Sequence, residues 1–587
     1  MTDARAIWLH ASVLLLALWV AFTCHLPRLG DGSSGFDAER AHVELSENIA
    51  AEPHEIIDVA AKKRLRDHLL ARFGELAEGF PEVDGRHASV DVQFGTMSRR
   101  EHLDDEERES FDEFEIHYPL ENLLLHVPGR RSDGALLLAA HYDSEFETTG
   151  AGDDGSACAA WLEVLRVLAL DGAPERDLLL LLTDGEEQGL LGAKLFQEQR
   201  REAAADENAI WNLPLIGALN FEAIGNDGRS ILFQTGPESG AFLEAYRRVV
   251  AQPIGSSLAP WIYDQLPNDT DLTVFRGMDL PGLNFAIVGG GSAYHQPFDR
   301  PENLPLETLS HQGETMLALV REITTLDEFR APTPAFQDVG GSTFVTFDPR
   351  IGEWLARIAV FGGLVLLLFG GRGGRLRRLG LGLVGGLLHG LVAILVVQLS
   401  IGAVVMLGEV VAPLLGIDEV ARGNRTSTTL VLLASVTVAV AAWRWMRELP
   451  LADERTLGAL VLIAFVAKAL AQAAPEGAHV LAVPVLAGLA ATWVLRGDEL
   501  AGWRHVVGAA LSGLALLASL AVLPSLAHVL STDPSAARTL GALLAVFAAV
   551  AVGPSLERVA PRKLATIVGV AGLGLGLVAG LLQAAGA

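Results

Sequence analysis

The feature that most constrains the fold of this chain is a series of long apolar segments that begins near residue 350. Most of them approach the roughly 20 residues that an α-helix needs to cross a bilayer core. Together with a segment at 7–24, the candidate spans are 352–370, 380–408, 427–443, 456–473, 478–495, 506–530, 538–553 and 565–586. The run 380–415 leaves open whether it is one helix or includes a re-entrant segment. The sequence predicts a cytoplasmic tip and transmembrane anchor in residues 1–30, and an all-α polytopic membrane domain of about eight helices in residues 346–587.

The basic residues between these spans predict an orientation. With a cytoplasmic N-terminus, 12 basic loop residues lie on the cytoplasmic side and three on the other, as the positive-inside rule favours. Residues 31–345 are then outside the cytoplasm. A cleaved signal peptide is the alternative for residues 7–24, but the apolar stretch is longer than usual and Phe22-Thr23 is a poor cleavage site. Only five of 44 basic residues are lysine, which indicates a GC-rich codon bias and therefore favours a bacterial source. With the orientation above, the spans would lie in a bacterial inner membrane and the domain would face the periplasm or the exterior.

The two parts of the chain differ in charge. Residues 351–587 have 17 Lys and Arg against 12 Asp and Glu, whereas the first 350 residues have 27 against 59. An acidic surface repels phosphates, so nucleic acid is not expected as a partner. The lipid bilayer is an expected partner. The role of the C-terminal spans stays open between anchoring, formation of a homodimer and presentation of membrane-derived peptides.

Residues 36–330 alternate short apolar runs with helical patterns. The apolar runs lie at 135–140, 177–183, 216–221 and 283–288, and helical patterns include 156–170 and 189–201. This alternation predicts an α/β three-layer sandwich with a mostly parallel central sheet, occupying residues 31–345. In such sheets, functional sites form at the carboxyl ends of the strands.

Polar side chains that can bind a metal ion or exchange a proton occur at the ends of all four predicted strands. In chain order they are His141, Asp143, Asp153, Glu186, Glu187, Glu222, Tyr294 and His295. Two histidines and three of the five carboxylates are candidate metal ligands, and one further carboxylate is spare. Adjacent glutamates usually begin a solvated helix, and one His-x-Asp is usually incidental. Recurrence at four successive strand ends is hard to explain by chance.

This set of residue types suits a pair of zinc ions. Zinc binds imidazole nitrogen and carboxylate oxygen, and a catalytic site leaves a position for water. Two ions close together need a bridging ligand, and Asp153 in its glycine-rich loop suits that role. The nucleophile would be a metal-bridging hydroxide. One of Glu186 and Glu187 is then a ligand and the other a general base. The sequence contains no His-Glu-x-x-His motif of single-zinc proteases.

Several motifs together resemble the co-catalytic di-zinc exopeptidases of clan MH, of the aminopeptidase and glutamate carboxypeptidase type. They are His141-x-Asp143, Gly-Ala-Gly-Asp153-Asp154-Gly-Ser, Gly185-Glu186-Glu187-x-Gly-Leu-x-Gly192 and Tyr294-His295-x-x-x-Asp299. Phe36-Asp-Ala-Glu-Arg-Ala, Pro53-His54 and Pro267-Asn-Asp-Thr-Asp-Leu-Thr-Val-Phe275 resemble the membrane-bound branch, the endoplasmic-reticulum metallopeptidases and fungal vacuolar membrane proteases. The motif-level resemblance covers roughly residues 36–330.

The resemblance implies a role for each of these residues. His141 and Glu222 would bind one zinc, Glu187 and His295 the other, and Asp153 would bridge them. Glu186 would be the general base, Asp143 would orient His141, and Tyr294 would donate a hydrogen bond to the oxyanion. Two positions depart from the pattern. Much of the clan has Asp in place of Glu222, and Glu55-Ile-Ile-Asp58 replaces the usual Gly-Ser.

The sequence therefore predicts a membrane-anchored zinc exopeptidase with two Zn²⁺ ions and a peptide substrate, acting as an aminopeptidase. One alternative is a single-zinc acyltransferase of the glutaminyl-cyclase type, which shares the fold but uses fewer ligands. The other is a catalytically silent receptor or scaffold ectodomain on a membrane bundle, in which the helices carry the function. The presence of all five ligands and the base favours the peptidase.

Overall fold

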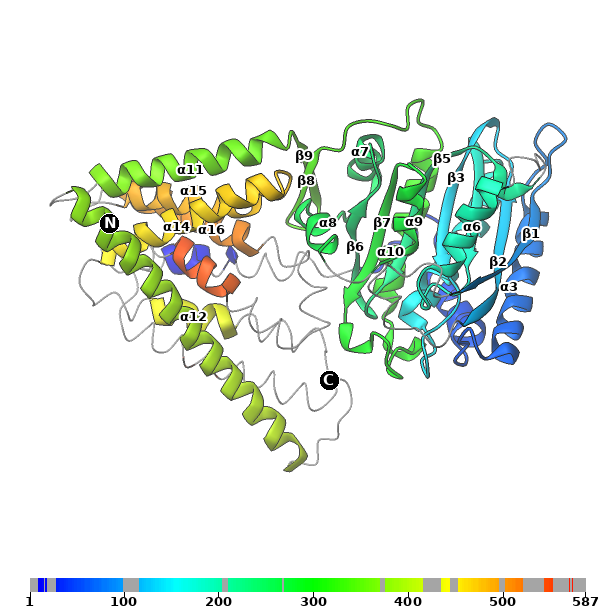
Figure 1. The fold of residues 1–587 in the computed structure, drawn as a ribbon, viewed down its shortest axis with the longest axis horizontal. Coiled ribbons are helices and arrows are strands. Elements are labelled where there is room, and N and C mark those ends of the chain that lie inside the picture. Colours follow the sequence, from blue (N-terminus) through cyan, green and yellow to red (C-terminus); the bar gives the residue numbers. More distant parts are fainter. Residues whose placement is uncertain are drawn as a thin grey trace.

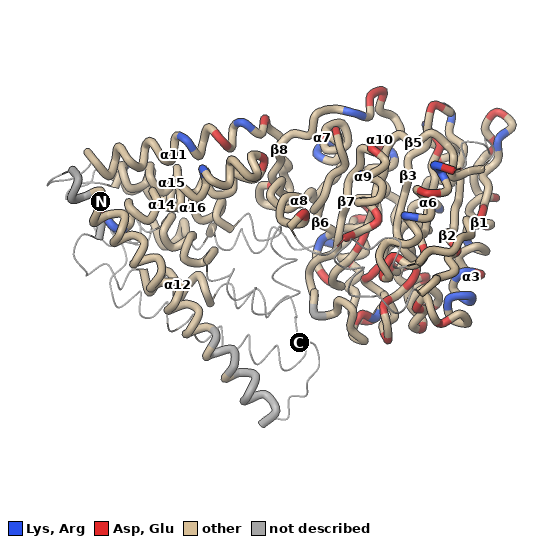
Figure 2. The backbone as a smooth tube through the Cα atoms, in the orientation of Figure 1, with Lys and Arg blue, Asp and Glu red and all other residues tan. Residues whose placement is uncertain are grey.

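The structure is a computed structural model of the full chain, and it describes most of the residues. The described ranges are 28–98, 116–202, 209–265, 269–369, 375–414, 434–443, 452–495, 502–520 and 543–552, with 9–14, 16–17, 570 and 573. An α/β region of residues 38–347 lies beside a group of apolar helices that begins at residue 350 (Figure 1). Among the described residues, those with charge are concentrated in the α/β region (Figure 2).

The α/β region is built on a seven-stranded sheet with the order β1-β2-β4-β3-β5-β7-β6. Its strands are β1 (Ser89–Ser98), β2 (His117–Val127), β3 (Arg131–His141), β4 (Arg176–Thr183), β5 (Leu215–Ala223), β6 (Asp227–Thr235) and β7 (Gly282–Gly289). The central strands β4, β3, β5 and β7 pair in parallel, whereas β1, β2 and β6 pair antiparallel with their neighbours. The sheet is therefore mixed, with a parallel centre.

Helices cover both faces of this sheet, and successive side chains of a strand point to opposite layers. Leu136 and Leu138 of β3 pack in the core beneath one helix layer, whereas Leu137 and Ala139 pack in the core beneath the other. The first layer contains α2 (Ala38–Glu44), α3 (Val59–Gly79), α5 (Ser156–Asp171), α7 (Gly240–Val249) and α10 (Leu306–Ile323). The second contains α6 (Leu191–Glu202) and α9 (Asp271–Gly277). Because both faces are covered, the central strands are apolar throughout, and the predicted three-layer α/β fold is confirmed.

The four apolar runs of the sequence correspond to the four parallel strands β3, β4, β5 and β7. The predicted helices 156–170 and 189–201 correspond to α5 and α6. The antiparallel strands β1, β2 and β6 were not predicted. The edge strand β1 is only partly buried along most of its length, so its sequence lacks the continuous apolar run that marks a central strand.

A two-stranded hairpin of β8 (Ala335–Val339) and β9 (Thr343–Phe347) leads into the C-terminal helices. These are α11 (Arg350–Phe369), α12 (Arg375–Leu414), α14 (Ala452–Ala473), α15 (His479–Val494) and α16 (Gly502–Leu520). Within the described residues, four helices are long and apolar enough to cross a membrane: 350–369, 379–401, 454–473 and 502–520. The run 380–414 belongs to one continuous helix, α12. The predicted spans at 7–24 and 565–586 lie largely outside the described residues.

Candidate metal centre and active site

The side chains expected to form the site meet at the carboxyl ends of the parallel strands. His141 is the last residue of β3, and Glu222 is the second-last residue of β5. Glu186 and Glu187 follow β4, and His295 follows β7. Because parallel strands end at one edge of the sheet, residues far apart in the chain become neighbours there.

One carboxylate, that of Asp153, lies between two His–Glu pairs. Its Oδ1 is 3.1 Å from His141 Nε2, which is 3.6 Å from Glu222 Oε2. Its Oδ2 is 3.7 Å from His295 Nε2, which is 3.1 Å from Glu187 Oε2. The two oxygens of Asp153 therefore face different imidazoles, the arrangement that a bridging ligand requires.

The ring of His141 is oriented by the backbone of the loop that follows it. Its Nδ1 lies 3.0 Å from the main-chain oxygen of Asp143 and 3.6 Å from Oδ1 of the same residue. A proton on Nδ1 donates to that main-chain oxygen and leaves Nε2 unprotonated toward Asp153, which is the tautomer a metal ligand needs. The Asp143 carboxylate accepts hydrogen bonds from the N–H groups of Glu186 and Glu187, at 3.1 and 3.3 Å. Asp143 thereby holds the turn that carries both glutamates.

Asp153 lies in the segment Ala151–Gly155, and the backbone of this segment is held by Asp299. Asp299 accepts hydrogen bonds from the N–H groups of Gly152 (2.7 Å) and Asp153 (3.2 Å). A Cβ on Gly152 would lie 2.5 Å from the carbonyl oxygen of Gly225, so this position has no room for a side chain. On the other side of the site, Asn220 donates to Glu222 Oε1 at 2.9 Å.

The electrostatics of the cluster fit a bound cation. Burial raises the pKa of Glu187 to about 7 and that of Glu222 to about 8. Burial opposes protonation of His295, but Glu187 and Asp153 raise its pKa to about 9. The buried Glu187 Oε1 has no hydrogen-bond partner among the described residues. Closely packed carboxylates with two imidazoles form a nitrogen and oxygen donor set that suits Zn²⁺, so the residues present fit such an ion.

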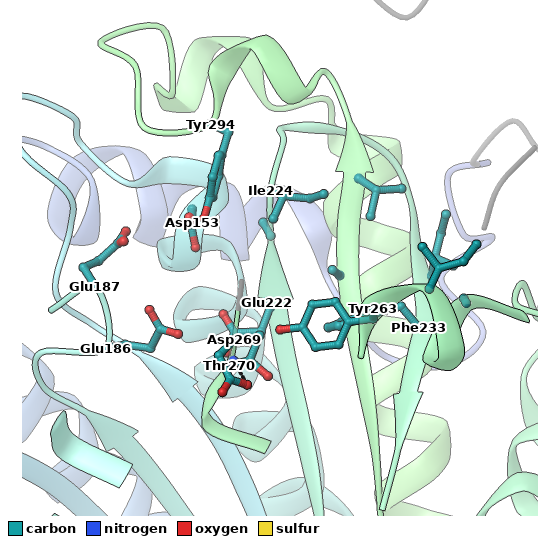
Figure 3. A pocket seen from close by; sticks show the side chains of 16 residues that line it. Asp153, Glu186, Glu187, Glu222, Ile224, Phe233, Tyr263, Asp269, Thr270 and Tyr294 are labelled. Carbon is teal, nitrogen blue, oxygen red and sulfur yellow. Dashed lines mark hydrogen bonds between the residues drawn. The ribbon is translucent and has the colours of Figure 1, made fainter. Parts of the chain in front are cut away.

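Glu186 and Tyr294 border the same space without belonging to the His–Glu pairs. Burial, followed by the carboxylates of Glu222 and Glu187, raises the pKa of Glu186 well above its ordinary value. Tyr294 stacks on the ring of His295 with a centroid distance of 3.7 Å, and its hydroxyl points toward Asp153 (Figure 3). Both side chains line the pocket that opens beside the metal-ligand cluster.

This pocket encloses about 720 Å³, part of it open to solvent. Away from the carboxylates its wall is apolar and comes from β5, β6, β7, α8 (Leu258–Tyr263) and the residues after β5. The apolar wall consists of Ala223, Ile224, Ile231, Phe233, Ala259, Ile262, Tyr263, Ala286 and Val288. Asp269 and Thr270, in the segment that joins α8 to α9, also line the pocket (Figure 3). Among the described lining residues none is Lys or Arg.

Four acidic residues at or near the site were not predicted from the sequence. Glu145 groups with Glu187 and His295, and Asp154 groups with His141 and Glu222. Asp271 accepts a short hydrogen bond from Thr183 at the end of β4. Asp269 lies in the quoted stretch Pro267-Asn-Asp-Thr-Asp, but the sequence held no sign that this stretch returns to the pocket. Its position depends on how α8 and α9 pack on the sheet.

Several known proteins are similar to this chain. Endoplasmic reticulum metallopeptidase 1 of Mus musculus is 29% identical over 236 residues, covering 38% of this chain and 25% of the mouse protein. A vacuolar membrane protease of Eremothecium gossypii is 28% identical over 371 residues, covering 61% of this chain and 34% of that protein. This chain therefore spans well under half the length of these curated relatives.

Among solved structures, a Zn-dependent exopeptidase from Parabacteroides distasonis is similar, with 18% identity and a TM-score of 0.36, covering 49% of this chain and 98% of that one. The glutaminyl cyclase of Fimbriiglobus ruber has 14% identity and a TM-score of 0.37, covering 50% and 97%. Residues 122–320 match the family described as Peptidase family M28. This stretch runs from β2 into α10 and contains all eight residues expected to form the site. Residues 122–320 of this chain are therefore a peptidase family M28 domain.

Proposed function

We propose that this protein is a membrane-anchored di-zinc metallopeptidase that acts as an aminopeptidase. The observation that carries the proposal is the Asp153 carboxylate, whose two oxygens face two separate His–Glu pairs. His141 and Glu222 would hold one zinc, and Glu187 and His295 the other. Bound zinc ions supply Lewis acidity toward a substrate carbonyl and toward water.

Glu186 is proposed as the general base. It borders the pocket and belongs to neither His–Glu pair. Its raised pKa suits a group that must take a proton from water and then give it to the leaving amine near neutral pH. The hydroxyl of Tyr294, directed toward Asp153 (Figure 3), is proposed to donate a hydrogen bond to the oxygen that becomes negative at the reacting carbonyl.

The charge of the pocket favours recognition of a free amine over a free carboxylate. A carboxypeptidase must hold the substrate carboxylate with cationic side chains, and the described pocket lining contains none. The lining instead carries the exposed carboxylate of Asp269 in addition to the candidate ligands. We propose that Asp269 pairs with the α-ammonium group of the substrate.

The decisive experiment compares the full-length protein in detergent with its Glu186→Gln variant. We expect about two zinc ions per chain in both proteins, and hydrolysis of aminoacyl reporters but not N-blocked dipeptides. The variant should lose about 10²- to 10⁴-fold in kcat, as expected for loss of a general base. Unchanged turnover would remove Glu186 from the mechanism. One zinc per chain with cyclisation of N-terminal glutamine would instead favour the single-zinc acyltransferase.

We further propose that the chain divides near residue 346 and that the peptidase domain lies on the non-cytoplasmic side. The relatives named above are proteins of the endoplasmic reticulum and of a vacuolar membrane, and the basic loop residues favour this side. Protease accessibility of the α/β region in intact and permeabilised cells tests the orientation.

A further inference from the structure

The short helix α8 forms part of the pocket wall. Ala259, Ile262 and Tyr263 of this helix line the pocket. The Tyr263 ring packs edge-on against Phe233 of β6, with ring centroids 4.8 Å apart. Its hydroxyl points toward the segment of Asp269 and Thr270 in Figure 3. The position of α8 therefore affects both the apolar wall and the acidic segment beside it.

The beginning of α8 rests on the turn between α14 and α15, at residues 475–478 of the C-terminal helices. The hydroxyl of Ser257, immediately before α8, donates to the main-chain oxygen of Glu476 at 2.8 Å and accepts from the N–H of Phe336 in β8 at 3.1 Å. A Cβ on Gly477 would lie 2.8 Å from Leu258 Cδ1 and 3.2 Å from its Cα. The turn thus contacts both the side chain and the backbone of the first residue of α8.

The same turn is held by the hairpin and by α11. His479 Nε2 lies 3.2 Å from Gln337 Oε1 of β8, and the His479 ring packs edge-on against Phe347 of β9 with centroids 4.9 Å apart. A Cβ on Gly352 of α11 would lie 3.0 Å from the main-chain oxygen of Pro475. Contacts from β8, β9 and α11 therefore hold the turn against the α/β region. Because the turn is held, it can position α8.

We infer that the turn at residues 475–478 positions α8, and that the C-terminal helices are thereby part of the substrate-recognition structure. This inference rests on the proposed aminopeptidase function and extends it. The apolar wall shaped by α8 receives an apolar substrate side chain next to the bond that is cut. Gly477 and Ser257 are positioning residues, because they touch α8 and not the pocket.

Gly477→Ala tests this inference in the full-length protein, with Gly362→Ala as its matched control. A Cβ on Gly362 in α11 has no described atom within 4 Å, so the control adds the same methyl group to the C-terminal helices without a clash. For Gly477→Ala we expect KM for a leucyl reporter to rise about tenfold, the effect of one poorly placed apolar contact. We expect kcat and zinc content within about twofold of the unmodified protein. An alanyl reporter, which scarcely reaches the apolar wall, should be cleaved as before.

Hydrogen exchange gives a second readout that does not depend on activity. Amides of α8 and of β6 should exchange faster in Gly477→Ala than in Gly362→Ala. Unchanged exchange in α8 would overturn the inference, as would equal losses with both reporters or loss of zinc. If the unmodified protein cleaves neither reporter, the proposed function fails, and exchange alone then decides whether the turn positions α8.

Discussion

Asp299 holds Asp153 in place from the loop that follows His295. Its carboxylate accepts hydrogen bonds from the N–H groups of Gly152 and Asp153, at 2.7 and 3.2 Å, and its main-chain oxygen accepts one from Thr149 at 2.7 Å. The residue with the shared carboxylate is therefore fixed through its backbone, which leaves both of its side-chain oxygens free to face the two histidines.

Replacement of Asp299 by alanine should weaken metal binding without removing a ligand. We expect zinc affinity to fall about 10- to 100-fold, as is typical when a group that orients a metal ligand is lost. Competition with a chromophoric chelator measures this change. Glu302→Gln, an exposed acidic position in the same loop region, serves as the control and should bind zinc like the unmodified protein. Equal affinity in all three proteins would mean that Asp299 does not position Asp153.

Replacement of Asp269 by asparagine should affect recognition of the substrate amine. Loss of a charge-assisted hydrogen bond should raise KM for aminoacyl reporters about tenfold and change kcat little. Asp264→Asn is the matched control, because Asp264 lies at the end of α8, is exposed and is absent from the pocket lining. A loss of the same size in both variants would contradict a specific role for Asp269.

Removal of the metal should destabilise the α/β region, and more so at higher pH. Without a cation, the pKa of Glu187 is about 7 and that of Glu222 about 8, above the ordinary value of a glutamate. A carboxyl group whose pKa is raised on folding adds stability at low pH, and this contribution is lost as pH rises through the folded pKa. The drop in melting temperature caused by a chelator should therefore grow between pH 6 and pH 8.5. A drop that is constant or shrinks over this range would contradict this electrostatic account.

His311 of α10 should make the α/β region sensitive to acid. Its Nδ1 accepts from the N–H of Ser230 at 3.2 Å, its Nε2 lies 2.9 Å from the main-chain oxygen of Gln252, and burial lowers its pKa to about 4. Because the folded pKa lies below that of the unfolded chain, the neutral ring stabilises the fold above pH 6.5. This stabilisation, about 3 kcal/mol, is lost as pH falls toward 4. Melting temperatures at pH 7.5 and 5 should differ less in His311→Gln than in the unmodified protein.

The central part of the fold could be predicted because its residues carry strong local signals. Strands β3, β4, β5 and β7 are continuous apolar runs, and α5 and α6 follow them with helical patterns. The edge strand β1 is half solvated, so its apolar pattern is weak. The acidic segment at Asp269 becomes part of the pocket only because α8 and α9 pack beside β6 and β7, and no local pattern encodes that distant contact.

By itself, the sequence determined the division into an acidic α/β region and a series of apolar helices, because composition and periodicity are local properties. It also determined which side chains follow the parallel strands, since those strands must end at one edge. The residue types alone left the choice between Glu186 and Glu187 open, and the family resemblance implied Glu187 as the ligand. The tertiary structure shows Glu187 beside His295 and each oxygen of Asp153 facing a different imidazole. It also decided that α8 rests on the turn after α14. These relationships depend on distances of a few ångströms between residues far apart in the chain, which are set by how the layers pack and not by any pattern along the sequence.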